Sequence, residues 1–420
     1  MQLPDATDVL VVGAGPAGAS AAAWAARGGA EVLLVDAATF PRDKTCGDGL
    51  TPRAVAELDQ LGLGSWVRGY GTNRGLRAAG FGQELLLPWP GGSLPDHGSA
   101  VPRTVLDDRL RQVALEAGAT GLEHARAVDA ERDGRGAVSA VIVEVGPERT
   151  RHRIACRRLI VADGVRSPLG KVLGRAWHRE TAYGVAGRTY VRSERADDPW
   201  ISSHLELRGE DDELLPGYGW IFPLGSAGEQ GREVNLGVGA LATAARPAAL
   251  QIRPLMAHYA RQRREEWGLG DELRLPTSAL LPMGGAVSGV AGPNWMLVGD
   301  AAGCVNPLNG EGIDYGLETG RVGAELAVGH EDLSAAWPAL LTHHYGEAFS
   351  IARRLAGLLT VPGLLPTFGP LGMRSYALMT IALRVMGNLV TDADRDLTAR
   401  VWRWAGRRSV ALDDRPPFTG

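Results

Sequence analysis

Cysteine and lysine are scarce in this sequence of 420 residues. The three cysteines, Cys46, Cys156 and Cys304, are too far apart for a zinc motif or a disulfide framework. The nine histidines show no paired-ligand spacing, so we expect no metal. A chain without disulfides fits a reducing cytoplasm. The net charge of −4 gives no electrostatic signature for binding nucleic acid.

Long uninterrupted apolar runs are also missing. Glycines break the N-terminal apolar stretch and no basic region precedes it, which argues against a secretory leader. Residues 355–373 carry no charge, but their three prolines and four glycines argue against a simple membrane-spanning helix. This stretch is predicted to be packed helix, a buried apolar wall or an element at a membrane surface. At a membrane, its flanking arginines would face anionic headgroups: Arg353, Arg354, Arg374 and Arg384.

What the sequence does contain is glycine, at 57 positions, and a glycine motif near the N-terminus. Residues 8–12 predict a buried strand, residues 16–27 a helix and residues 31–36 a second strand. The turn after the first strand is Gly13-Ala14-Gly15-Pro16-Ala17-Gly18, which is typical of dinucleotide binding in this context. The first glycine allows the tight bend, the second lets the backbone approach a pyrophosphate, and the third lets helix pack on strand. The helix N-terminus attracts the phosphates.

Three carboxylates at the ends of predicted strands extend this interpretation. Asp36 would accept the hydroxyl groups of an unphosphorylated adenosine ribose, as in NAD or FAD but not NADP. Asp163 and Asp300 each follow another buried strand at a glycine turn, in LIVADG and WMLVGDAA. FAD is favoured over NAD because its ribityl chain needs a partner far from the adenosine, and Asp300 is placed for that role.

The remaining patterns predict an α/β fold with discontinuous units. Strands between residues 183 and 241 indicate an antiparallel sheet inserted into a Rossmann-type domain, and helices follow beyond residue 335. We also expect separate strands at 150–156 and 159–162, a strand at 204–207 and a helix near 247–267. The predicted units are an FAD-binding domain (1–70, 102–182 and 290–330), a substrate-binding antiparallel β domain (71–101 and 183–289) and a C-terminal helical segment (331–420).

Several longer runs resemble one flavoprotein family. They are the glycine motif at 13–18, FPRDKTCGDG at 40–49, Arg103, GYGWIFP at 217–223, and GD at 299–300 running to NGEGI at 309–313. With them, the chain resembles the FAD-dependent aromatic-hydroxylase-like flavoproteins and, within these, the geranylgeranyl reductase family. CGDGLTPRAV and NPLNGEGIDYGLETG look like the branch that saturates one isoprene unit of the menaquinone tail. The resemblance implies hydride transfer from reduced FAD to an alkene carbon of a polyprenyl lipid.

The resemblance also implies which residues hold the cofactor. Those expected to contact FAD or to carry the loop near its ring are Arg103, Ala127, Cys46, Gly47 and Asp48. Gly312 and Ile313 begin a helix after a glycine-rich loop. Their N–H groups would face the N1–C2=O edge of the flavin, where reduced flavin carries negative charge.

Three side chains are candidates for the reaction itself. Cys46 is either a small packed residue or a group near the alkene. Tyr218 and Trp220 alternate along a predicted strand, so they face one side. Together with Phe222 they form either plain core or an aromatic wall for the substrate. The proton for the second alkene carbon would come from Tyr218, water or a nearby acid.

Other functions stay open at this point. They are reduction of geranylgeranyl diphosphate or a geranylgeranyl lipid, and FAD-dependent aromatic monooxygenation. A flavin halogenase resembles the chain at 217–223, but arginines such as Arg74 and Arg77 stand where it needs a lysine. A quinone-linked electron carrier needs a second redox centre that three cysteines do not supply. We expect a cytoplasmic enzyme at the inner face of the membrane, reduced by a transiently bound nicotinamide or a membrane redox partner.

Overall fold

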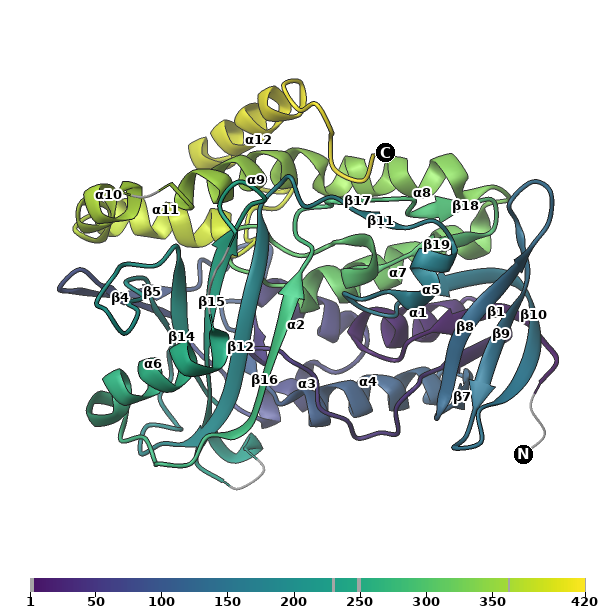
Figure 1. Cartoon of the computed structure of the whole chain (residues 1–420), viewed down its shortest axis with the longest axis horizontal. Coiled ribbons are helices and arrows are strands. Elements are labelled where there is room, and N and C mark those ends of the chain that lie inside the picture. Colours follow the sequence, from purple (N-terminus) through teal and green to yellow (C-terminus); the bar gives the residue numbers. More distant parts are fainter. Residues whose placement is uncertain (1–3, 229–230, 248–250, 362, 420) are drawn as a thin grey trace.

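The computed structural model describes residues 4–228, 231–247, 251–361 and 363–419, and two large β-sheets organise them (Figure 1). A Rossmann-type sheet, a mainly antiparallel second sheet and C-terminal helices confirm the α/β fold class. The second sheet takes two strands from residues 75–88 and the others from residues 183–281. This topology supports the proposed discontinuous units, whose boundaries stay a prediction.

The central parallel strands of the first sheet, β1, β2, β19 and the end of β10, are aliphatic and buried on both faces. Its order is β18–β19–β10–β1–β2–β7, and an antiparallel ribbon of β9 and β8 continues from β10. β10 is one strand, although the sequence predicts two. Its first half pairs with β9 and its second half with β1, while Arg157 and Arg158 interrupt only the apolar pattern. The strands are β1 Ala6–Val12, β2 Val32–Val35, β7 Thr120–Leu122, β8 Ala125–Arg132, β9 Val138–Val145, β10 Thr150–Val161, β18 Ala291–Gly292 and β19 Trp295–Leu297.

Two helix N-termini meet at the carboxyl ends of these parallel strands. α1 (Pro16–Arg27) packs closely on α7 (Ile313–Gly329) because small residues form the contact. A Cβ atom at Gly320 would lie 2.3 Å from the main-chain oxygen of Ala17. α4 (Arg103–Glu116) lies on the other side of α1. The turns that carry Gly13 and Asp300 therefore face one common site.

The second sheet has the order β16–β12–β15–β14–β13–β4–β5 and is antiparallel except between β13 and β4. Its strands are β4 Gly75–Gly80, β5 Gln83–Pro88, β12 Tyr183–Arg192, β13 Ile201–His204, β14 Gly217–Pro223, β15 Glu233–Ala242 and β16 Arg274–Leu281. α6 (Ile252–Trp267) packs against this sheet through an apolar cluster that includes Trp267 and Tyr259.

In this region one predicted strand is displaced, one strand was missed, and one predicted helix is confirmed over its described part. The strand expected at 204–207 lies at 201–204, where it pairs with both β14 and β4. β16 was not predicted, because Pro276 and half-exposed side chains hide its strand pattern. The helix expected near 247–267 is present from Ile252, and residues 248–250 lie outside the described part of the chain.

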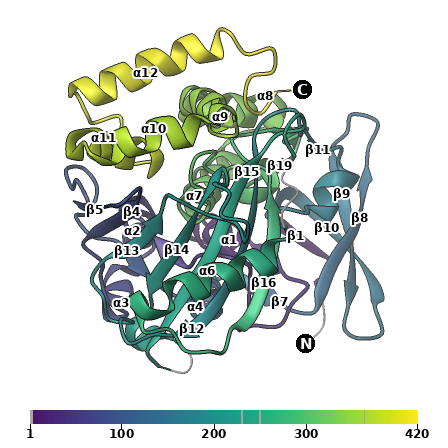
Figure 2. The ribbon, with the colours of Figure 1, turned by 60° about the vertical axis from the view of Figure 1, so that its left-hand side comes forward.

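Helices fill the C-terminal part of the chain as predicted, up to residue 410. They are α8 Leu333–Leu341, a π-helical turn Thr342–Gly346, α9 Glu347–Leu359, α10 Leu364–Met373, α11 Tyr376–Met386 and α12 Leu397–Val410. α10 and α11 contact β5, and α12 lies outermost (Figure 2). Among the described residues, no single helix has the length and apolarity to cross a membrane. The helical segments Leu333–Leu359 and Leu364–Met373 together reach that length and apolarity, but the pair is bent by 112° at the break between them.

Short elements complete the fold and shape the loops of the site. β3 pairs with β6 and so fixes the segment after Cys46, while β11 pairs with β17. The remaining bounds are β3 Gly49–Leu50, α2 Pro52–Gln60, α3 Gly64–Gly69, β6 Ser99–Ala100, α5 Pro168–Val172, β11 Ala176–Trp177, β17 Val287–Ser288, and the 3-10 turns Gly225–Ala227 and Gly299–Ala302.

Candidate active site

One continuous cavity of about 740 Å³ runs from the ends of the first-sheet strands to the second sheet. All but one of the residues predicted for cofactor or catalysis line it. They are Gly13, Gly15, Pro16, Ala17, Asp36, Cys46, Gly47, Asp48, Arg103, Ala127, Asp163, Tyr218, Trp220, Asp300, Gly312 and Ile313. The exception is Gly18, whose predicted role is packing. A Cβ atom there would lie 1.7 Å from the main-chain oxygen of Gly13.

The glycine turn leaves an open cradle in front of α1. Gly13 has a φ of +100°, and a Cβ atom on it would lie 2.3 Å from the main-chain oxygen of Ala162. At Gly15, by contrast, a Cβ atom would meet only the guanidinium groups of Arg42 at 3.3 Å and Arg103 at 3.8 Å, with a carboxylate oxygen of Asp107 at 4.0 Å. No side chain caps the N-terminus of α1. Free N–H groups beside two cations fit the pyrophosphate of FAD.

Asp107 orients the two arginines of this cradle. Arg103 donates to it through Nε at 2.6 Å and Nη2 at 2.7 Å, and Nη1 of Arg42 lies 3.0 Å from Oδ2. Asp107 is fully buried, so the ion pair is shielded from water. Sequence reasoning missed Asp107 and Arg42. The spacing of Arg103 and Asp107, four residues apart on a helix, was the available signal.

Asp36 lines the adenosine end of the cavity, but it also holds its own loops. Its Oδ2 accepts from the N–H of Ala14 at 2.7 Å, and its Oδ1 accepts from the N–H of Ala38 at 2.8 Å. Each carboxylate oxygen can accept a further hydrogen bond, so a ribose hydroxyl still fits. The ribose contact stays a prediction.

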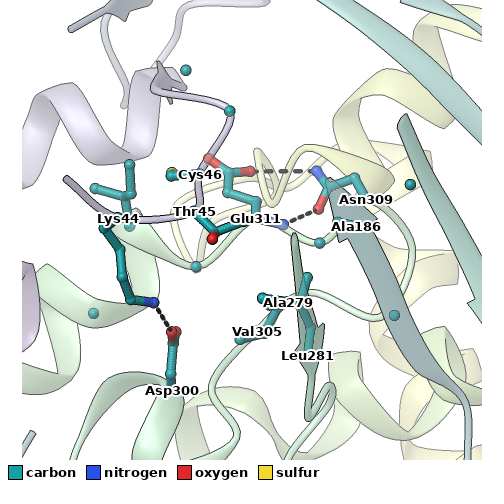
Figure 3. Close-up of a pocket in the computed structure, with 18 of the residues that line it drawn as sticks. Lys44, Thr45, Cys46, Ala186, Ala279, Leu281, Asp300, Val305, Asn309 and Glu311 are labelled. Atoms are coloured by element: carbon teal, nitrogen blue, oxygen red, sulfur yellow. Dashed lines mark hydrogen bonds and ion pairs between the residues drawn. The ribbon is translucent and has the colours of Figure 1, made fainter. Parts of the chain in front are cut away.

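Asp163 is placed differently from what its strand-end position suggests. Its Oδ1 accepts from the hydroxyl of Ser167, and its Oδ2 accepts from the N–H of Leu169 at 2.8 Å. Both oxygens therefore stabilise the turn before α5. Asp300 remains open to the cavity, with Oδ2 3.8 Å from Nζ of Lys44 (Figure 3). Of the two, Asp300 better fits the ribityl contact.

The loop at 46–49 is locked against the second sheet by Asp48. Its Oδ2 accepts from the hydroxyl of Tyr190 at 2.7 Å and from the Asn235 amide at 2.8 Å. Burial raises the pKa of Asp48 to about 6. The carboxyl group therefore stabilises the loop, and Gly47 and Asp48 line the cavity. A Cβ atom at Gly49 would lie 2.9 Å from the ring of Phe222, so the loop packs directly on the aromatic side chains.

Cys46 stands in this loop as a neutral thiol. Burial raises its pKa, an effect larger than the opposing effect of Arg103. A neutral thiol is a poor nucleophile, which favours a steric role beside the flavin. We expect Cys46→Ala and Cys46→Ser to keep FAD and to lose turnover by about tenfold, since a slightly misplaced substrate reacts more slowly. Steady-state assays on both variants at equal flavin content test this. Full activity in both would remove Cys46 from the mechanism.

Tyr218, Trp220 and Phe222 form the aromatic wall that the alternation predicts. Ring centroids lie 5.9 Å apart for Tyr218 and Trp220, and 6.3 Å apart for Trp220 and Phe222. The indole N–H of Trp220 donates to Oδ1 of Asn235 at 2.9 Å. The hydroxyl of Tyr218 donates to the main-chain oxygen of Asn309, and burial raises its pKa. This bond favours a positioning role, and proton donation by Tyr218 stays a prediction.

The N-terminus of α7 reaches the cavity beside these aromatics. Gly312 is its N-cap residue and no side chain caps the helix. Gly312 and Ile313 line the cavity at this helix start, and the contact of their N–H groups with the flavin stays a prediction. Sequence reasoning weighed only the glycines and isoleucine of NGEGI and missed Glu311, which also lines the cavity.

Part of the cavity wall is apolar. Side chains from β15 and β16, from the loop after β16, from the loop before α7 and from α11 form it: Leu241, Leu281, Met283, Val305, Leu383 and Met386. Figure 3 shows Leu281, Ala279 and Val305 at this wall. Such a surface accepts a hydrocarbon chain and excludes water.

Comparison with known proteins agrees with this geometry. Residues 6–208 match the FAD binding domain family. The chain is 62% identical to the menaquinone reductase of Mycolicibacterium smegmatis, over 98% of this chain and 99% of that protein. It is 31% identical to digeranylgeranylglycerophospholipid reductase 1 of Methanopyrus kandleri, over 84% of this chain and 90% of that protein. A solved geranylgeranyl bacteriochlorophyll reductase-like protein of Thermoplasma acidophilum shares the fold, with a TM-score of 0.72 at 19% identity over 98% and 97% of the two chains.

These matches confirm that the cofactor is FAD and that the protein is a flavin oxidoreductase. The cradle at Gly15 and the two helix N-termini fit that cofactor on structural grounds as well. The chain belongs to the menaquinone reductase family of FAD-dependent enzymes.

Proposed function

We propose that this enzyme saturates one C=C bond in the isoprenoid side chain of menaquinone. The observation that carries the proposal is the cavity, which joins the FAD cradle to an apolar channel without interruption. The relatives at 61–62% identity are menaquinone reductases, which supports the quinone over other polyprenyl lipids.

The apolar channel contributes binding free energy for the isoprenoid chain and excludes water from the reaction. Burying apolar carbon contributes about 0.8 kcal/mol per CH₂ group, so one five-carbon isoprene unit contributes on the order of 4 kcal/mol. An isolated alkene is a poor hydride acceptor, and the reaction therefore needs a water-free site and a fixed substrate. Leu281, Met283 and Val305 exclude water, while the rings of Tyr218 and Trp220 hold the chain flat.

FAD, when bound and reduced, supplies a hydride from N5. The protein holds it through the N–H groups at Gly15 and Gly312 and through the oriented guanidinium groups of Arg42 and Arg103. Electrons reach the flavin from a transiently bound nicotinamide or a membrane redox partner.

Mass spectrometry of the quinone pool tests the substrate. Cells that carry the gene should contain menaquinone with two more hydrogen atoms in its side chain than cells that lack it. An unchanged quinone pool with altered geranylgeranyl lipids would instead assign the lipid as substrate and overturn the menaquinone proposal.

We also propose that α10 and α11 rest on the inner face of the membrane. Their outward apolar side chains, named here the α10–α11 face, are Phe368, Leu371, Tyr376, Leu378 and Ile381, each 43–60% exposed. The same helices line the cavity with Leu365, Met379 and Leu383, which gives a lipid tail a short apolar route inward. Of the four arginines predicted to meet headgroups, Arg374 is exposed. Ion pairs engage the others: Arg353 and Arg354 with Asp413, and Arg384 with Asp396.

The double variant Phe368→Glu/Leu371→Glu should bind lipid vesicles at least about tenfold more weakly. Both side chains are 60% exposed, and burying a Phe or Leu side chain contributes roughly 1.5–3 kcal/mol. Co-sedimentation with vesicles containing an anionic phospholipid measures the effect. The matched control is Leu275→Glu, at a leucine that is 45% exposed on β16. Equal binding by both variants would contradict the membrane contact.

A further inference from the structure

A row of three buried carboxyl groups begins at the cavity and continues along α7. Glu311 lines the cavity just before the helix, and Asp314 and Glu318 follow at helical spacing on the same side. Figure 3 shows Glu311 and its two hydrogen bonds with Asn309. The three groups are not needed to hold FAD, and the reaction described above gives them no role.

Among the described residues, one oxygen of each carboxyl group makes no hydrogen bond of good geometry: Glu311 Oε1, Asp314 Oδ1 and Glu318 Oε2. The nearby donors are the hydroxyl of Thr51 for Glu311, the N–H of Tyr315 for Asp314 and the hydroxyl of Tyr345 for Glu318. The other oxygens have partners. Glu311 Oε2 accepts from the Asn309 amide at 3.4 Å, Asp314 Oδ2 accepts from the Asn388 amide at 2.9 Å, and Glu318 Oε1 lies 3.5 Å from Nη1 of Arg53. A buried carboxylate oxygen without a well-placed donor is costly, whereas a protonated oxygen is itself a donor.

The balance of buried charges also favours protonated carboxyl groups in this row. Arg53 on α2 faces this row. Arg321 on α7 also interacts with Glu318, but its charge is balanced by its ion pair with Glu57. Tyr218 on β14, Tyr315 and Tyr345 face the row as neutral phenols. Three carboxylates against one guanidinium would leave two buried negative charges uncompensated. Burial, together with the charge of Asp314, raises the pKa of Glu311 well above its usual range, and burial raises the pKa of Asp314 to about 6. In the described residues, no group of three acidic, histidine or cysteine side chains is arranged to hold a metal ion in compensation.

We infer that Glu311 is the acid that protonates the alkene, and that Asp314 and Glu318 return the proton to it. This inference rests on the proposed function. The C=C π bond breaks, one carbon gains the hydride of the reduced flavin, and the other carbon gains the proton of the Glu311 carboxyl group. The alkene is reduced by two electrons, the flavin is oxidised by two, and Glu311 is left as a carboxylate. A proton passes to it along the row, whose outer member Glu318 keeps 11% of its side chain exposed.

The structure prefers Glu311 to Tyr218 for this step. The hydroxyl group of Tyr218 is engaged with the main-chain oxygen of Asn309, whereas Glu311 lines the cavity and donates no hydrogen bond from its carboxyl group to the described residues. The Asn309 side chain holds Glu311 from both ends, because its amide donates to the carboxyl group and its oxygen accepts from the Glu311 N–H at 2.9 Å.

The test compares Glu311→Gln with Glu325→Gln, a change at an exposed position on the same helix. Both variants are loaded with FAD, reduced anaerobically with dithionite and mixed with menaquinone, and flavin reoxidation is followed by absorbance. We expect Glu311→Gln to bind and reduce FAD normally but to reoxidise at least about 100-fold more slowly, the lower range for a lost general acid. Glu325→Gln should match the wild type.

Two further readouts separate proton donation from a structural effect. The wild-type reoxidation rate should fall as pH rises through the pKa of Glu311, since only the protonated form donates, and this fall should be absent in Glu311→Gln. Infrared spectra of the protein without substrate should show the C=O stretch of a protonated carboxyl group that disappears in Glu311→Gln. If that variant does not fold, Asp314→Asn should shift the single-turnover pH profile downward, because a neighbouring negative charge is lost.

The outcomes are distinguishable. If menaquinone does not reoxidise the wild-type flavin, or reoxidises it without gaining two hydrogen atoms in its side chain by mass spectrometry, the proposed function fails. If it does, and Glu311→Gln reoxidises at the wild-type rate or lacks the infrared difference, Glu311 is not the proton donor.

Discussion

Replacing Gly15 by valine should give a folded protein that has lost its yellow colour. A side chain at this position meets two flexible guanidinium groups and one carboxylate oxygen at the edge of contact, so the fold can accept it. It would nevertheless fill the space in front of α1, where we expect the pyrophosphate of FAD to bind. Losing two hydrogen bonds to a charged group costs roughly 3 kcal/mol or more, which lowers FAD affinity by at least about 100-fold.

The measurement is FAD content of the purified variant and its affinity by flavin titration, with circular dichroism to check the fold. The matched control is Gly134→Val, at a glycine with no neighbour within 4 Å and no positive φ. Gly18 would be a poorer choice, since a side chain there collides with the main chain of Gly13 and disrupts the turn itself. A Gly15→Val protein that keeps one FAD per chain would show that the cofactor lies elsewhere.

Filling the channel should separate the flavin from its substrate. Ala186 on β12 lines the cavity near Asn309 and Glu311 (Figure 3). A Cβ atom on the neighbouring Gly239 would meet Ala186 only at ordinary contact distance, 3.9 Å, so the cavity side of this strand has room. We expect Ala186→Trp to bind FAD and to accept electrons from dithionite. Its reoxidation by menaquinone should slow by about 100-fold or more, because the alkene no longer reaches its reactive position.

Ala176→Trp is the control, since Ala176 is exposed on β11 and does not line the cavity. Loss of FAD from Ala186→Trp would mean that the indole displaces the ring rather than the lipid. Wild-type reoxidation by Ala186→Trp would contradict the path proposed for the isoprenoid chain.

The parts of the site that the sequence predicts are those fixed by local backbone geometry. The turn at Gly13–Gly18 is set by close main-chain approach, and the helix start at Gly312 follows from the same kind of rule. The alternation of Tyr218 and Trp220 likewise needs only the period of a strand.

The parts that sequence reasoning missed depend on contacts between distant segments. Asp48 itself was predicted at the site, but its hydrogen bonds with Tyr190 and Asn235 of the other sheet, more than 140 residues along the chain, were not. Arg42 joins the cradle only through Asp107. β10 is predicted as two strands because Arg157 and Arg158 interrupt its apolar pattern, whereas its continuity depends on pairing with β9 and then β1. Glu311 lies inside a recognised motif, but the lack of a well-placed donor for its Oε1 emerges only once α2 and α7 are packed together.

The most direct test of the account is a single anaerobic turnover with purified enzyme. One equivalent of reduced, FAD-loaded protein is mixed with menaquinone, flavin reoxidation is recorded, and the quinone is extracted for mass spectrometry. The account predicts that reoxidation occurs together with the gain of two hydrogen atoms in the isoprenoid side chain. Reoxidation that reduces only the quinone ring and leaves the side chain unchanged would contradict it.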